Sequence, residues 1–226
     1  MEPIPSIDLI LGGHNHFFFN TPEYIGKTPI IQDGEFGIRV GINDFDKSLK
    51  PFSLLNYFQD IASDSAEKLG FGYSYIHPRN LMWVLLKYRI EFNEYPSDVQ
   101  QLKLWTIPRG CNRLFAYRNF ELKSGEKLLA KASSMWAVVD FTKMEMANCE
   151  NVFALNDSMA KFVQSEGDLK FGKVPALTNT DFEEEFLVRY NDIDVNMHAN
   201  NANYIVWALE PLPLEFKTEH KIKNID

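Results

Sequence analysis

The sequence predicts an α+β fold in which an antiparallel sheet wraps around one central helix, followed by the beginning of a second copy of the same unit. Two observations lead to this prediction. One strongly amphipathic helix signal is followed by several strand signals, with turn signals between them. In addition, the pattern Asn-Asp-x-Asp at 43–46 recurs at 191–194, each time before an apolar segment, which indicates an internal duplication.

The central helix is predicted over 52–69, after an entering strand at 38–45. Its apolar residues recur at the i, i+3, i+4 spacing of a helix that buries one face. Pro51 and Gly70 flank it as start and stop signals. The expected buried residues are Leu54, Leu55, Phe58, Ile61, Ala62, Ala66 and Leu69.

Four strands are expected after this helix, because alternating apolar runs are separated by turn residues. Ser124 and Gly125 predict a hairpin between the last two of them. The predicted strands cover 81–92, 101–108, 113–122 and 127–140. We expect a first domain at 38–145, a linker at 146–185 and a second domain at 186–226. Within these we expect a short helix at 156–162 capped by Asn156, a strand at 186–190 and another strand beginning within 216–225.

The candidate catalytic residues lie at the start of the second copy. Asp194, Asn196 and His198 are spaced by two, so an extended backbone directs all three side chains to one side. A carboxylate fixes the tautomer of a neighbouring imidazole, and an amide can orient a carbonyl or a water molecule. An alternative is that the acid and amide supply only turn and cap chemistry. An alignment without gaps puts Ser48 and Lys50 at the positions of Asn196 and His198, so only the second copy carries the polar set.

Three separated motifs resemble acyl-acyl-carrier-protein thioesterases, which contain two tandem hotdog domains. They are NDFDKSLKPFSLLNYFQDIASDSAEKLGFG, LMWVLLKYRIEFNEYP and NDIDVNMHANNANYIVWALEPLP, in the family's order. The resemblance implies a hotdog fold, complete in the first copy and incomplete in the second, where we expect at least three strands to be missing. It implies that Asp194, Asn196 and His198 are the catalytic residues, and that a further catalytic acid and a cysteine would lie beyond Asp226.

The activity implied is release of a fatty acid from acyl carrier protein in fatty acid biosynthesis, with no metal and no organic cofactor. We expect Trp83, Phe115 and Trp136 to line the acyl tunnel, although packing in the core is an alternative for each. A second hypothesis is a fragment without turnover that binds acyl chains or assembles with other hotdog subunits as a homo-oligomer through exposed sheet edges.

The composition restricts the partners. A net charge of −8 argues against general binding of nucleic acid. The resemblance implies an acidic carrier protein as partner, which would need a local basic patch. The candidates, each of which has ordinary solvated charge as the alternative, are Lys87, Arg89, Arg109, Arg113, Arg118 and Lys131. Two cysteines, Cys111 and Cys149, form no disulfide framework, and no apolar run is long enough for a membrane span. We therefore expect a cytoplasmic protein.

Residues 1–37 differ from the rest of the chain. The sequence IDLILGGHNH, with PIIQDGEFG after it, resembles the last metal-binding motif of 5′-nucleotidase-type metallophosphoesterases. The earlier ligand motifs of that family are missing, and His14 and His16 alone give a first-row metal too few ligands. We expect a fragment without a metal site and regard a metal-dependent phosphoesterase as the weakest of the three hypotheses.

Overall fold

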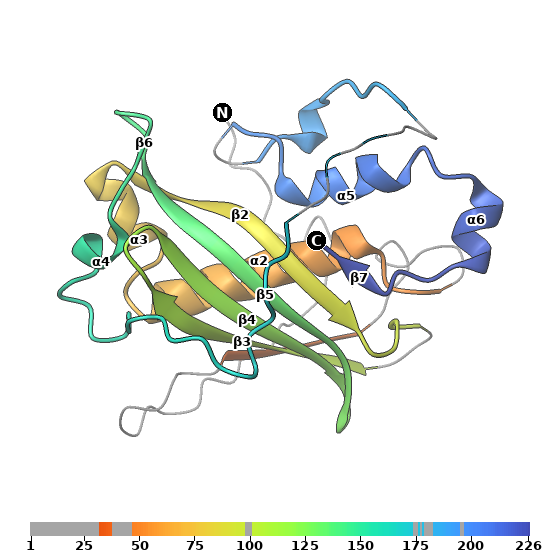
Figure 1. Cartoon of the computed structure of the whole chain (residues 1–226), viewed down its shortest axis with the longest axis horizontal. Helices are drawn as coiled ribbons and strands as arrows, with labels where there is room; N and C mark the ends of the chain where they lie inside the picture. The colour runs from red at the N-terminus through yellow and green to blue at the C-terminus, as the bar shows by residue number, and fades with distance from the viewer. Residues whose placement is uncertain are drawn as a thin grey trace.

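In the computed structural model, one antiparallel sheet curls around a single long helix (Figure 1). The structure describes residues 32–37, 47–97, 101–173, 176, 178, 183–194 and 197–226. The strands are β1 Gln32–Gly37, β2 Leu81–Phe92, β3 Gln101–Cys111, β4 Phe115–Ser124, β5 Lys127–Asp140, β6 Glu145–Met146 and β7 Asn224–Ile225. The helices are α2 Pro51–Lys68, α3 Tyr73–Ile76, α4 Cys149–Val152, α5 Asn201–Leu209 and α6 Leu214–Glu219, with 3-10 turns η1 His77–Arg79 and η2 Tyr190–Asp192. The strand order is β1–β3–β4–β5–β2–β7, with β6 beside β5, which confirms the predicted α+β class.

Helix α2 begins and ends where its sequence signals place it. Pro51 occupies the first turn, where its missing N–H costs no hydrogen bond. Gly70 leaves the helix at φ +76°, a conformation that glycine adopts without strain. The apolar face is buried against the sheet, where the rings of Phe58 and Phe120 stack with 4.5 Å between their centroids. The predicted helix at 52–69 is therefore confirmed to within one residue at each end.

Strands β2 and β5 have the predicted bounds, and Gly125 at φ +55° forms the predicted hairpin turn between β4 and β5. Strand β4 is displaced by two residues from its prediction, and β3 continues beyond Pro108. The continuation depends on an irregularity between Pro108 and Gly110, at which the register with β4 shifts. Gly110 has φ +90°, and a Cβ atom there would lie 2.3 Å from the carbonyl oxygen of Ala160. Glycine therefore allows the later chain to approach this strand.

That later chain, residues 160–171, is called the strap below. It crosses the face of the sheet opposite α2, as Figure 1 shows in cyan. It begins by pairing with the end of β3, where Phe162 donates its N–H to the carbonyl of Cys111 at 2.7 Å. The predicted helix at 156–162 is wrong. Asn156 instead holds the end of α2, donating from Nδ2 to the carbonyls of Leu69 and Gly70, and the short helix α4 is capped by Asn148.

The second copy joins the first at two places. Helix α5 lies beside α2, where Ala202 is fully buried in the core. Strand β7 extends the sheet by pairing Ile225 with Ile90 of β2. One expectation for this part is wrong, because the described residues at 186–190 form no strand before η2. The strand expected to begin within 216–225 is found as the two-residue strand β7, after the end of α6.

The two copies correspond with an offset of 150 residues in backbone conformation. Lys50 before α2 has φ −61° and ψ 133°, and Asn200 before α5 has φ −58° and ψ 130°. Three residues earlier in each copy, Lys47 has φ +64° and Met197 has φ +62°. The alignment without gaps used an offset of 148, from the two Asn-Asp-x-Asp patterns. It is therefore wrong by two residues at the helix, because the second copy has two more residues between its pattern and its helix. By backbone position, Ser48 and not Lys50 is the counterpart of His198.

The amino-terminal predictions fall mostly on residues that the structure does not describe. His14, His16, the strand at 38–45 and the first Asn-Asp-x-Asp pattern all lie outside the described residues. Residues 32–37 are described as β1, which pairs antiparallel with β3. The sheet therefore includes residues that we assigned to the segment before the first domain.

Candidate active site

The loop that carries Asp194 and His198 is closed by its own backbone. The N–H of Asp194 donates to the carbonyl of His198 at 2.8 Å, and Ile193 and Ala199 form an antiparallel bridge. Below them, the N–H of Asn200 donates to the carbonyl of Asp192 at 2.7 Å. The loop is thus a narrow hairpin with Asp192 and Asn200 at its base, and α5 begins directly after it.

The structure brings Asp194 and His198 together, and it does so through the main chain. The carboxylate of Asp194 accepts the backbone N–H of His198 at 3.1 Å, while the residue His198 is exposed. Asn196 lies outside the described residues. The carboxylate therefore contributes to the shape of the loop, and its relation to the imidazole stays a prediction.

An apolar cavity of about 70 Å³ lies between α2 and the concave face of the sheet. Ala62 and Ala66 line it from the helix, and Trp83 and Trp136 line it from β2 and β5. Phe115, the third predicted tunnel residue, is absent from its described lining and stands at the start of β4, where its N–H bonds to Asn112. Most of the surface that lines the cavity is apolar, so the cavity suits an apolar group.

Both tryptophans are held in place by hydrogen bonds from their indole N–H groups. Trp83 donates to the carbonyl of Phe71 at 2.9 Å, and its ring stacks on Phe153 with 5.4 Å between centroids. Trp136 donates to Ser134 Oγ at 2.7 Å. Anchored aromatic rings give the cavity fixed walls.

A buried cation forms part of the cavity wall. Arg118 points from β4 toward α2 and donates from Nη1 to Ser65 Oγ and to Thr106 Oγ1, both at 3.0 Å. Burial lowers the pKa of its guanidinium to about 10. The expectation that Arg118 belongs to a docking patch is wrong, because the side chain lies inside the molecule.

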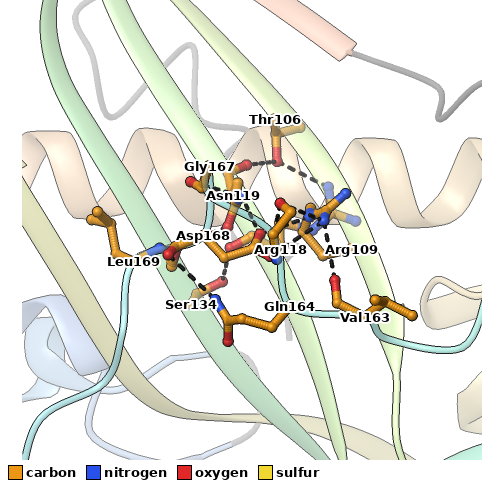
Figure 2. Close-up of polar contacts among 12 residues, drawn as sticks. Thr106, Arg109, Arg118, Asn119, Ser134, Val163, Gln164, Gly167, Asp168 and Leu169 are labelled. Atoms are coloured by element: carbon orange, nitrogen blue, oxygen red, sulfur yellow. Dashed lines mark hydrogen bonds and ion pairs between the residues drawn. The ribbon is translucent and has the colours of Figure 1, made fainter.

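The strap is fixed to the outer face of the sheet by a second polar network, which Figure 2 shows. Asp168 accepts Arg109 Nε at 2.7 Å and Asn119 Nδ2 at 2.7 Å. Ser133 Oγ donates to Asn119 Oδ1 at 2.7 Å and accepts the N–H of Leu169 at 3.0 Å. Arg109 is therefore bound to the strap and, like Arg118, is a poor candidate for docking a carrier protein.

Metal or thiol chemistry receives no support from the part of the chain that the structure describes. No group of three or more His, Cys, Asp or Glu there could hold a metal ion. Cys111 and Cys149 are both buried, and a hydrogen bond from the Cys149 thiol lowers the pKa of Cys111 while raising that of Cys149. No helix within the described ranges is long and apolar enough to cross a membrane.

Comparisons with known proteins agree with this arrangement. The model of the acyl-ACP thioesterase N-terminal domain matches residues 31–154, and that of the C-terminal domain matches 176–226. The chain is 30% identical to the chloroplastic acyl-[acyl-carrier-protein] hydrolase FATB3 of Cuphea viscosissima, over 84% of this chain and 50% of the relative. It is 28% identical to the chloroplastic palmitoyl-acyl carrier protein thioesterase of Arabidopsis thaliana, over 90% of this chain and 53% of the relative. The chain thus spans about half the length of the curated relatives it matches.

Solved structures give the same result. An acyl-ACP thioesterase of Bacteroides thetaiotaomicron superposes with a TM-score of 0.75 at 25% identity, covering 86% of this chain and 78% of the other. The 12:0-ACP thioesterase of Umbellularia californica, at 19% identity, superposes with a TM-score of 0.72, covering 86% and 79%. The likeness confirms the hotdog architecture. The metallophosphoesterase resemblance of residues 1–37 finds no support, and the thioesterase domain model begins at residue 31.

Proposed function

The chain belongs to the acyl-ACP thioesterase family, and from this membership we propose that it hydrolyses the thioester between an acyl chain and acyl carrier protein, releasing the fatty acid. One observation carries the proposal. The loop with Asp194 and His198 continues into a helix that packs on α2, and the same α2 covers the apolar cavity of the first copy. Gln59 lies beside the loop and Ala66 lines the cavity, about 10 Å apart along the helix. An acyl chain in the cavity would leave its thioester near the loop.

In the proposed reaction, a water molecule attacks the thioester carbonyl. His198 accepts a proton from that water, the C–S bond breaks, and the carrier thiolate takes up the proton as the carboxylic acid is released. Asn196 would hold the carbonyl oxygen or the water, and Asp194 would support the pair electrostatically while holding the loop in shape.

The substrate would be presented by an acidic carrier protein. Of the six basic residues expected to dock it, Arg118 is buried, Arg109 binds Asp168, and Arg89 binds Glu91 and Asp226. Lys87, Arg113 and Lys131 therefore remain as the candidates that we propose for docking.

Substitution of His198 by alanine tests the proposal. We expect kcat for a medium-chain acyl-acyl-carrier-protein to fall by about 100-fold to 10,000-fold, since a general base is lost, with the affinity for the substrate little changed. His220→Ala is the matched control, because this exposed histidine stacks on Phe216 in α6 and should leave kcat unchanged. Full turnover by His198→Ala would contradict the proposal.

A second candidate function is binding of acyl chains, or assembly with other hotdog subunits, without turnover. The observation that favours it is the number of exposed apolar side chains in the second copy. Leu187, Tyr190, Met197 and Tyr204 are each more than half exposed. Binding of acyl-acyl-carrier-protein by the unaltered protein, with no release of fatty acid, would support this candidate.

A further inference from the structure

We propose that the side-chain amides of Gln59 and Asn56, on the central helix of the first copy, are positioning residues for the catalytic loop of the second copy. The proposal rests on the proposed function, because it assigns these amides a role in that reaction. It concerns the three hydrogen bonds that join α2 to the two residues before Ala202, which are called the amide ladder below.

The amide ladder is formed by four side chains. Gln59 accepts Asn201 Nδ2 at its Oε1 at 2.9 Å, and donates from Nε2 to Asn200 Oδ1 at 3.4 Å. Asn200 in turn donates from Nδ2 to Asn56 Oδ1 at 3.4 Å. All three bonds are partly buried, so loss of a partner costs more there than at a fully solvated surface.

Asn200 is at the base of the loop, so the ladder holds the loop and not only the helix. Its N–H bonds to the carbonyl of Asp192, and the carbonyl of Asp192 also accepts Asn203 Nδ2 at 3.0 Å. Asn200 Oδ1 caps α5 by accepting the N–H of Ala202 at 3.0 Å. From this base the hairpin extends to Asp194 and His198. A shift of Asn200 relative to α2 would therefore move both side chains relative to the acyl cavity.

Amides suit this position because each supplies a donor and an acceptor with no charge. Asn200 cannot reverse its amide without cost, since its oxygen already caps Ala202 and its nitrogen already bonds to Asn56. Gln59 supplies the second donor to Asn200 Oδ1, beside the N–H of Ala202. A carboxylate at position 59 would place two acceptors against each other.

The test uses the whole protein with Gln59→Leu and Gln59→Glu, and Gln164→Leu as matched control. Gln164 bonds to the carbonyl of Asp168 in the strap, on the opposite face of the sheet from α2. For Gln59→Leu we expect backbone amide exchange in residues 192–200 to accelerate by about tenfold. We expect kcat for a medium-chain acyl-acyl-carrier-protein to fall by about tenfold to a hundredfold, with KM changed by less than about threefold. The control should change neither exchange nor kcat.

Gln59→Glu adds a second measurement, which is the pH dependence of amide exchange in the loop. A general loss of stability would not make this exchange depend on the protonation of residue 59. At neutral pH this variant keeps the acceptor for Asn201 and loses the donor to Asn200, so the loop should again exchange faster than in the wild type. Protonation of the glutamate at lower pH restores a donor. The ratio of exchange rates, variant over wild type at each pH, should therefore fall toward one as the pH is lowered.

Exchange and turnover separate this inference from the proposed function. Loop exchange in folded Gln59→Leu as slow as in the wild type would overturn the inference, whatever happens to kcat. If the unaltered protein does not hydrolyse acyl-acyl-carrier-protein, the proposed function fails, and exchange alone decides whether the ladder holds the loop. If Gln59→Leu does not fold, the pH dependence of Gln59→Glu decides in its place, and an exchange ratio of one at every pH overturns the inference.

Discussion

The carboxyl group of Asp60 shows how one residue can make stability depend on pH. It lies on α2 next to Gln59, and its Oδ2 is buried with no hydrogen-bond partner among the described residues. Burial raises its pKa to about 7. Burial also raises the pKa of the nearby Tyr88 hydroxyl, far above its usual range, with Arg118 opposing this change and Asp60 adding to it. The folded protein therefore favours a neutral Asp60 below neutral pH.

Asp60→Asn should stabilise the protein at pH 8 and have little effect at pH 3.5. Above pH 3.8 the carboxyl ionises in the unfolded chain, whereas in the folded chain it keeps its proton to about pH 7. The free energy of unfolding of the wild type consequently decreases between these values and is constant above them. We expect a gain of roughly 2–4 kcal/mol for the variant at pH 8, measured by urea unfolding. A gain that is equal at both pH values would contradict this explanation.

At the scale of elements, the strap depends on one ionised carboxylate. Burial alone would raise the pKa of Asp168, but hydrogen bonds from Arg109, Ser165 and Asn119 outweigh it and lower the pKa. A carboxyl with a lowered pKa stabilises the folded state above its ordinary pKa, and this contribution is lost as the pH falls through the lower folded value. The strap should therefore be held firmly at neutral pH.

Asp168→Asn should release the strap from the sheet at pH 7. The variant loses the ion pair with Arg109, so we expect unfolding to require about 1–3 kcal/mol less and proteases to cut within residues 160–171 more readily. Asp157→Asn is the control, because Asp157 is exposed just before the strap. Equal cleavage of the two variants would show that the network of Asp168 does not hold the strap.

The elements that the sequence predicted best are those that pack directly on the core. Helix α2 and strands β2 and β5 pack directly on the core, so their periodicity and flanking turn residues suffice. Predictions failed where a distant contact decides the local structure. Asn156 has the side chain of a helix cap, yet it bonds to the end of α2, and residues 186–190 alternate like a strand but do not form one.

The candidate site was predictable to a similar extent. Spacing placed Asp194 and His198 on one loop, and Trp83 and Trp136 line an apolar cavity, while their contact with an acyl chain stays a prediction. Phe115 does not line it, because its position on β4 depends on a register that the sequence does not reveal. The contacts of Asn56 and Gln59 with the second copy were missed, because one face of an amphipathic helix is expected to be polar and solvated.

At the scale of the whole molecule, the two copies are joined where α5 packs against α2, a contact that is called the seam below. The amide ladder forms its polar part, and Ala202, which directly follows Asn201, forms its apolar part in the same core as Phe58. The helix that carries Ala202 therefore packs into the core of the first copy. A change in that core should affect both copies together.

Ala202→Leu tests this shared core. No space exists for the larger side chain at a fully buried position, so we expect the free energy of unfolding to decrease by about 1–3 kcal/mol. Because the seam belongs to one core, the urea transitions followed by circular dichroism and by tryptophan fluorescence should move together and coincide. Tyr204→Leu, at a position 61% exposed on the same helix, should leave both transitions in place. If the two transitions of Ala202→Leu separate, the two copies do not form one cooperative unit.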